Sequence, residues 1–217
     1  MKKTAVFILV FAVILTGCAD TKKHSKGVYM LLDTDTSGTY TFELKKAQSI
    51  LNYLLGILQP LDTLAVARID TGNFSEKDII ANITFNRRPS VANNQKRAFQ
   101  KRLGNFISKV TSSRYTDISG GILQAIEYLN EADPGKKYIL IFSDLKEELK
   151  NEQVRDIPFQ LAGFHIIALN VTKLSADNHD PRNYLKRIEQ WRVKVESGNG
   201  KWRIANDLEQ LEKILAK

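Results

Sequence analysis

The chain has 217 residues, of which 43% are hydrophobic and 26% are charged, enough apolar material for one domain with a substantial core. Its formal net charge is +8, but the lysines and arginines are spread along the chain without an aromatic-interleaved basic motif, so nucleic-acid binding is not expected. Cys18 is the only cysteine, which excludes a disulfide within the chain.

Residues 1–17 have the pattern of an export signal. Lys2 and Lys3 form a positive start, and an apolar run from Ala5 to Leu15 follows, shorter than the about 20 residues that span a membrane. The run ends in Leu15-Thr16-Gly17-Cys18, which resembles the lipobox of bacterial lipoproteins. The resemblance implies cleavage before Cys18 and lipidation of that cysteine. The alternative is an ordinary signal peptide followed by a chance cysteine.

Residues 18–26 are short, polar and basic, so we interpret them as a lipidated N-terminus and a tether to the membrane. Two or more acyl chains on Cys18 would hold the protein durably, because each buried CH₂ contributes about 0.8 kcal/mol. The expected location is therefore the cell envelope. Asp20 lies one position beyond the place where an aspartate marks inner-membrane retention. This favours the outer membrane if the source has two membranes.

The remaining residues, 27–217, are predicted to form one α/β domain in which strands and helices alternate. We expect strands at 27–33, 64–69, 82–85, 138–143, 164–171 and 201–204, and helices at 42–58, 91–110, 118–131, 181–196 and 207–216. The segment 145–156 is expected to be a charged loop with a helical turn, and 82–85 an edge strand. The near-continuous apolar runs at 28–32 and 138–142 are typical of central parallel strands buried on both faces. The alternation predicts a doubly wound, mostly parallel sheet with helices on both faces.

Polar residues follow the two most apolar strands. The first strand is followed by Asp35-Thr36-Ser37-Gly38-Thr39, the strand at 138–143 by Asp144, and a polar turn at 115–121 precedes a predicted helix. The carboxyl ends of parallel strands share one edge of a sheet, where ligands bind. Carboxylates and hydroxyls gathered there would form an oxygen-only site that suits Mg²⁺ first, then Mn²⁺ or Ca²⁺.

The loop Asp35-Thr36-Ser37-Gly38-Thr39 resembles the Asp-x-Ser-x-Ser/Thr loop of von Willebrand factor type A (VWA) domains. Thr116 and Asp144 fall where that family has its second and third metal loops, so the resemblance covers roughly residues 27–215. It implies a Rossmann-like VWA fold and a metal-ion-dependent adhesion site. The site residues would be Asp35, Ser37, Thr39, Thr116 and Asp144, with Mg²⁺ or Mn²⁺ bound. A protein partner would supply an Asp or Glu carboxylate to the metal, and no catalytic residue is implied.

Asp33 departs from the family pattern, which has one aspartate at that strand end. It could pack against the sheet edge or displace Asp35 as a metal ligand. The string Asp33-Thr34-Asp35-Thr36 also resembles the start of haloacid-dehalogenase-type phosphatases, with Asp33 as nucleophile, Asp35 as general acid and Mg²⁺ assisting. A third alternative is a VWA-like scaffold without metal, whose hydroxyls and aspartates cap helices and turns.

Overall fold

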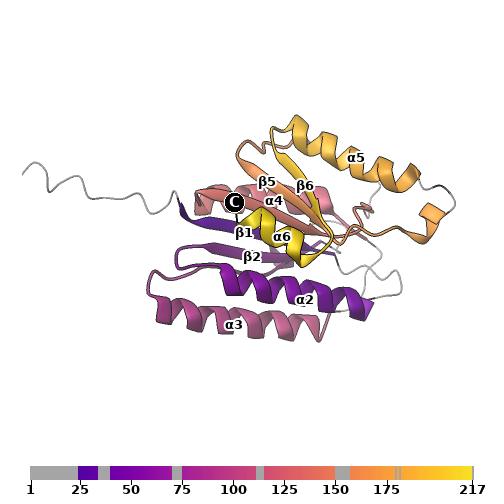
Figure 1. Cartoon of the computed structure of the whole chain (residues 1–217). Helices are drawn as coiled ribbons and strands as arrows, with labels where there is room; N and C mark the ends of the chain where they lie inside the picture. The colour runs from indigo at the N-terminus through magenta and orange to yellow at the C-terminus, as the bar shows by residue number, and fades with distance from the viewer. Residues whose placement is uncertain are drawn as a thin grey trace, which may run out of the picture.

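A computed structural model describes residues 24–33, 40–69, 75–110, 115–149, 157–178, 180 and 182–216. They form a six-stranded sheet in the order β3-β2-β1-β4-β5-β6, with helices on both faces (Figure 1). The strands are β1 (Lys26–Leu32), β2 (Thr63–Arg68), β3 (Ile79–Thr84), β4 (Lys136–Phe142), β5 (Phe164–Leu169) and β6 (Lys201–Ala205). The helices are α2 (Tyr40–Ile57), α3 (Pro89–Ile107), α4 (Ile118–Ala132), α5 (Arg182–Ser197) and α6 (Leu208–Leu215).

The sheet confirms the predicted doubly wound α/β architecture. All neighbouring strands in it run parallel except β3, which pairs antiparallel with β2. As expected, β3 lies at an edge, but it begins at Ile79 rather than at residue 82. A register shift between Val66 and Ala67 of β2 lets the pairing continue to Ile79.

The centre of the sheet is built from β1 and β4, whose apolar runs exclude solvent on both faces. Met30, Leu31 and Leu32 of β1 are completely buried, as are Leu140 and Ile141 of β4. Side chains alternate between the two faces, so one strand serves two cores at once. This double burial is why neither sequence shows the apolar–polar alternation of a half-exposed strand.

Two hydrophobic cores lie on opposite faces of the sheet. On one face, α2, α3 and α6 bury Leu54, Phe99 and Leu211 against Met30 and its neighbours. On the other face, α4 and α5 bury residues such as Ile122 and Trp191. Figure 1 shows α2 and α3 side by side along one side of the sheet, with α5 on the other. Both faces of the central strands are therefore closed, and only the strand ends remain for binding.

Across the described parts of the chain, none of the helices combines the length and the apolar character needed to cross a membrane.

Candidate functional site

The strand order reverses between β1 and β4, and this point places the candidate site. From β1 the chain proceeds outward through β2 to β3, whereas from β4 it proceeds outward through β5 to β6. Open α/β sheets bind ligands at such a switch point, beyond the carboxyl ends of the two adjacent strands. Asp33 directly follows β1 and Ser143 directly follows β4, so both lie at the switch point.

Among the described residues, hydroxyl groups from two other segments of the chain meet at the carboxylate of Asp33. The Ser143 hydroxyl donates a hydrogen bond to Oδ2 of Asp33 at 2.7 Å. The Thr116 hydroxyl lies 3.4 Å from both Oδ1 and Oδ2, long for a hydroxyl–carboxylate bond. Three segments that are far apart in the sequence thus bring oxygen atoms to one point.

Backbone hydrogen bonds at the edge of the sheet carry the Thr116 loop to Asp33. Ile69, just after β2, donates its N–H to Leu32 and accepts from the N–H of Asp117 at 2.7 Å. Thr116 also exchanges both backbone hydrogen bonds with Glu148, each at 2.9 Å. Only 1% of the Thr116 surface is therefore exposed, although the residue lies in a loop.

Helix α4 begins at this loop and packs very closely on the central strands. The Asp117 carboxylate accepts from the N–H of Gly120 at 2.7 Å and so caps the helix. A Cβ at Gly121 would lie only 2.7 Å from Ile69 and 2.9 Å from Leu31. The glycine therefore allows the first turn of α4 to approach the ends of β1 and β2.

The segment after β4 turns sharply, and the turn is held by its own side chains. The N–H of Leu145 donates to the Ser143 hydroxyl at 3.0 Å, and the N–H of Lys146 donates to Oδ1 of Asp144 at 2.8 Å. Leu145 has a φ of 69°, an unfavourable conformation for a leucine that costs roughly 1–3 kcal/mol. Burial of its side chain, which is 1% exposed, offsets that cost.

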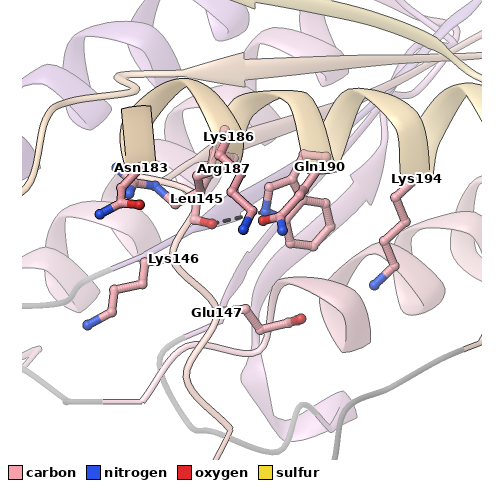
Figure 2. A pocket seen from close by; sticks show the side chains of 9 residues that line it. Leu145, Lys146, Glu147, Asn183, Lys186, Arg187, Gln190 and Lys194 are labelled. Atoms are coloured by element: carbon pink, nitrogen blue, oxygen red, sulfur yellow. Dashed lines mark hydrogen bonds between the residues drawn. The ribbon is translucent and has the colours of Figure 1, made fainter. Parts of the chain in front are cut away.

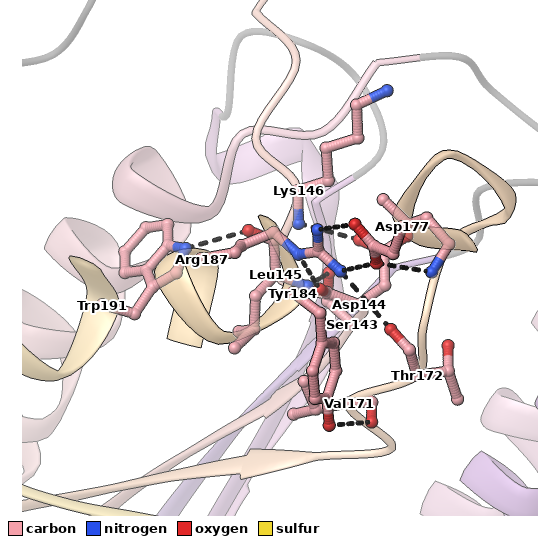
Figure 3. A network of polar contacts seen from close by, with 11 residues as sticks. Ser143, Asp144, Leu145, Lys146, Val171, Thr172, Asp177, Tyr184, Arg187 and Trp191 are labelled. Atoms are coloured by element: carbon pink, nitrogen blue, oxygen red, sulfur yellow. Dashed lines mark hydrogen bonds and ion pairs between the residues drawn. The ribbon is translucent and has the colours of Figure 1, made fainter. Parts of the chain in front are cut away.

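Helix α5 holds this turn in place through two carbonyl groups (Figure 3). Nε of Arg187 donates to the carbonyl of Asp144 at 2.9 Å, and the indole N–H of Trp191 donates to the carbonyl of Leu145 at 2.9 Å. Trp191 is therefore a packing residue with a satisfied polar group rather than an exposed platform.

Arg187 is itself held by a buried carboxylate. Its guanidinium forms an ion pair with Asp177 at 2.9 Å, and the two side chains are only 13% and 3% exposed. The hydrogen bond from Arg187 lowers the pKa of Asp177 below its ordinary 3.8, and the N–H of Leu174 contributes further. Asp177 thus stays ionised and fixes the arginine that positions Asp144.

The structure brings two of the sequence-predicted site residues, Thr116 and Asp144, to the same edge of the sheet. Asp35, Ser37 and Thr39 lie outside the described residues. Of the predicted loop 145–156, residues 145–149 are irregular apart from the bridge at Glu148, and the rest lies outside the described residues.

Sequence reasoning missed the parts of the site that act by tertiary contact. It placed Ser143 only at the end of a strand and Glu147 only in a charged loop, and it gave no role to Arg187 or Asp177. The apolar strand followed by Ser143-Asp144 was a usable signal for Ser143. Nothing in the spacing of Asp177 and Arg187 distinguishes their pair from ordinary helix-surface charges.

The donor set of this edge suits a hard cation better than a soft one. Within the described ranges, no group of three or more His, Cys, Asp and Glu side chains is arranged to hold a metal ion. Among the described residues, the side-chain oxygens at this edge come from the Thr116 and Ser143 hydroxyls and the carboxylates of Asp33 and Asp144. Thr116 provides such an oxygen, because a hydroxyl that donates to Asp33 keeps its lone pairs to accept or coordinate.

Comparisons with known proteins identify the fold. No protein-family model matches the chain, and no match was found among curated proteins. Among solved structures, a von Willebrand factor type A protein from Catenulispora acidiphila has a TM-score of 0.54 at 12% identity, covering 88% of this chain and 40% of that one. The pilus adhesin SpaC from Lactobacillus rhamnosus GG, in an open conformation, has a TM-score of 0.51 at 10% identity, covering 88% and 29%.

This chain therefore spans less than half the length of either structure. At such identities the similarity concerns the fold, and it confirms the VWA-type α/β arrangement expected from the sequence.

The Arg187–Asp177 pair makes a testable contribution to stability. Arg187→Met leaves the Asp177 carboxylate buried without its partner, so the free energy of unfolding at neutral pH should fall by about 3 kcal/mol. The pKa of Asp177 is lowered in the folded protein, so the stabilisation is present above pH 3.8 and is lost as the pH falls through the lowered value. Urea titrations between about pH 7 and pH 2 should show the two proteins converging in acid.

Arg192→Met is the matched control, because Arg192 lies on the same helix and pairs with Glu189 and Glu196 at the surface. It should cost less than about 1 kcal/mol. Equal losses in the two variants would show that Asp177 does not depend on Arg187.

Proposed function

We propose that this protein is a membrane-anchored envelope lipoprotein whose VWA-like domain recognises other proteins through a bound divalent cation. The observation that carries the proposal is the convergence of Asp33, Thr116 and Ser143 at the β1–β4 switch point, with contacts of 2.7–3.4 Å. The VWA-type fold shared with the solved structures supports this reading.

The proposed ligand set is that of the sequence analysis, extended by one residue. Asp35, Ser37, Thr39, Thr116 and Asp144 remain the proposed metal ligands, directly or through water. Asp33 joins them, because it is the carboxylate that directly follows β1 and receives the Ser143 hydroxyl. Ser143 would orient Asp33 in the way that carboxylate ligands are commonly held by hydrogen bonds.

When bound, Mg²⁺ or Mn²⁺ would offer an electrophilic position to an incoming carboxylate. The chain's own contribution is to hold hydroxyl and carboxylate oxygens at this edge of the sheet. Thr116 is fixed by its backbone pairing with Glu148, and Asp144 by the turn that Arg187 holds. This arrangement serves binding without turnover.

The metal is tested by calorimetry and thermal melting of a soluble chain of residues 19–217. Mg²⁺ or Mn²⁺ at a hundredfold excess over Kd should stabilise it by about 2.7 kcal/mol, and EDTA should remove that gain. Asp33→Ala, Thr116→Ala and Asp144→Ala should each weaken binding strongly. Thr172→Ala serves as the control, because Thr172 is exposed and Arg187 contacts it through its backbone carbonyl, which the substitution keeps.

A melting temperature indifferent to both the cations and EDTA would favour the metal-free scaffold. A metal effect accompanied by hydrolysis of an aryl phosphate, abolished by Asp33→Asn, would instead favour the phosphatase alternative. Recognition itself requires that an envelope protein captured in Mg²⁺ be released by EDTA and recaptured in Mn²⁺.

The anchor is tested separately. Cys18→Ser removes the only thiol that could be acylated, so metabolic labelling with a fatty-acid analogue should disappear, and the precursor should remain uncleaved or be mislocalised. Thr16→Ser keeps the small residue that the lipobox requires, so it should leave labelling intact. Unchanged labelling of the Cys18 variant would contradict the proposal.

A further inference from the structure

A second binding feature opens beside the candidate metal edge. Between residues 145–147 and α5 lies a cleft of about 560 Å³. Its lining includes Lys146, Glu147, Lys186, Arg187, Gln190 and Lys194. Figure 2 shows Lys186, Gln190 and Lys194 spaced along α5, with Lys146 and Glu147 on the loop that forms the other side of the cleft. Because Lys146 is two residues from Asp144, the cleft adjoins the candidate metal site directly.

The cleft is lined by four cationic side chains and one carboxylate, and two of the cations are already paired. Arg187 is bound to Asp177, and Lys146 forms an ion pair with Glu148 at 2.6 Å. Lys186 is exposed, and within the part of the chain that the structure describes no carboxylate lies at ion-pair distance from it. It therefore contributes an uncompensated positive charge.

Lys194 is fixed in position without losing its charge. Its ammonium donates to the Ser119 hydroxyl at 2.7 Å and lies 4.9 Å and 5.0 Å from the ring centroids of Phe159 and Trp191. None of these partners is a carboxylate. The side chain is thus held against α4 and the sheet while its positive charge stays at the cleft.

Glu147, the one acidic side chain in the lining, is directed toward α4. Its carboxylate accepts from the N–H of Ser119 at 2.6 Å and from the Ser119 hydroxyl at 3.1 Å. The Glu147 carboxylate thus accepts a backbone N–H that the first turn of α4 leaves without an intrahelical partner. Within the described residues it forms no direct ion pair with Lys186 or Lys194. The cleft consequently keeps a positive surplus.

We propose that this cleft binds a carboxylate-rich, extended segment of a protein partner. The proposal deepens the metal-dependent recognition proposed above and rests on it for the identity of the partner, which would place one carboxylate at the metal edge and others in the cleft. Lys186 and Lys194 lie eight residues apart on α5, about 12 Å along the helix. An extended segment rises about 3.3 Å per residue, so acidic residues three to four positions apart match both lysines.

The lining favours such a peptide over a nucleic acid. Single strands bind by stacking their bases on exposed aromatic rings, whereas Trp191 is 6% exposed and already donates its indole N–H to Leu145. Glu147 would also repel a continuous phosphate backbone, but spaced carboxylates can avoid it.

The test uses the full chain in neutral detergent and a fluorescent dodecapeptide with glutamate at every fourth position in a Ser/Gly background. Anisotropy titrations are run in EDTA and in Mg²⁺. Lys186→Glu and Lys186→Glu/Lys194→Glu should raise Kd in EDTA, by about fivefold for each reversed charge. Added salt should weaken the wild-type interaction and shrink this difference. Circular dichroism and melting of each variant establish that it is folded.

The matched control is Lys101→Glu/Lys109→Glu. Both residues are exposed and lie on or just after α3, which covers the opposite face of the sheet. Its net charge equals that of the cleft double variant, so a change of less than twofold is expected. An equal loss would overturn the proposal by showing that the peptide responds to total charge alone.

Two further outcomes are decisive. An oligonucleotide of equal charge that binds more tightly and responds to Lys186→Glu would overturn the proposal in favour of a nucleic-acid site. Because peptide binding to the cleft is measured in EDTA, its outcome does not depend on whether the protein binds a metal ion. A metal-dependent interaction that is unchanged by the Lys186 and Lys194 variants would contradict the cleft proposal alone.

Discussion

The burial of the apolar runs of β1 and β4 on both faces of the sheet is the constraint on which the rest of this structure depends. Apolar runs with no polar side have to lie between two layers of helices, which places them at the centre of the sheet. Because the chain winds outward in both directions from these two strands, their carboxyl ends form the switch point. Asp33 and Ser143 meet there as a consequence of hydrophobic burial, and the 2.7 Å hydrogen bond between them follows.

A second organising feature is α5, which connects the candidate metal edge to the neighbouring cleft. Arg187 and Trp191 hold the backbone carbonyls of Asp144 and Leu145, while Lys186 and Lys194 of the same helix line the cleft. One rigid helix thus positions both features, so the loop after β4 needs little order of its own. This arrangement suits the proposed recognition of a partner that presents several carboxylates at fixed separations. It assigns the buried Asp177 a purely supporting role.

Much of the fold was predictable because the residue pattern of each segment favours the same element that the whole fold requires at that place. The apolar runs at 28–32 and 138–142 and the polar turn at 115–121 each predicted an element that the structure contains, with ends shifted by a few residues. β3 was harder, because its edge position leaves its burial irregular and its first residues depend on the register shift in β2. In the candidate site, Thr116 and Asp144 were predictable from their places at loop and strand ends.

The amino-acid sequence by itself determined the class of fold, the central strands and the type of oxygen-bearing residue at their ends, since periodicity and burial are properties of each segment alone. Only the tertiary structure decided which oxygens meet. It placed Asp33 against Ser143 and Thr116, turned Glu147 toward α4 and paired Arg187 with Asp177. These contacts join residues that are 10 to 110 positions apart. Such distances are closed by sheet register and helix packing, which no local pattern of residues encodes.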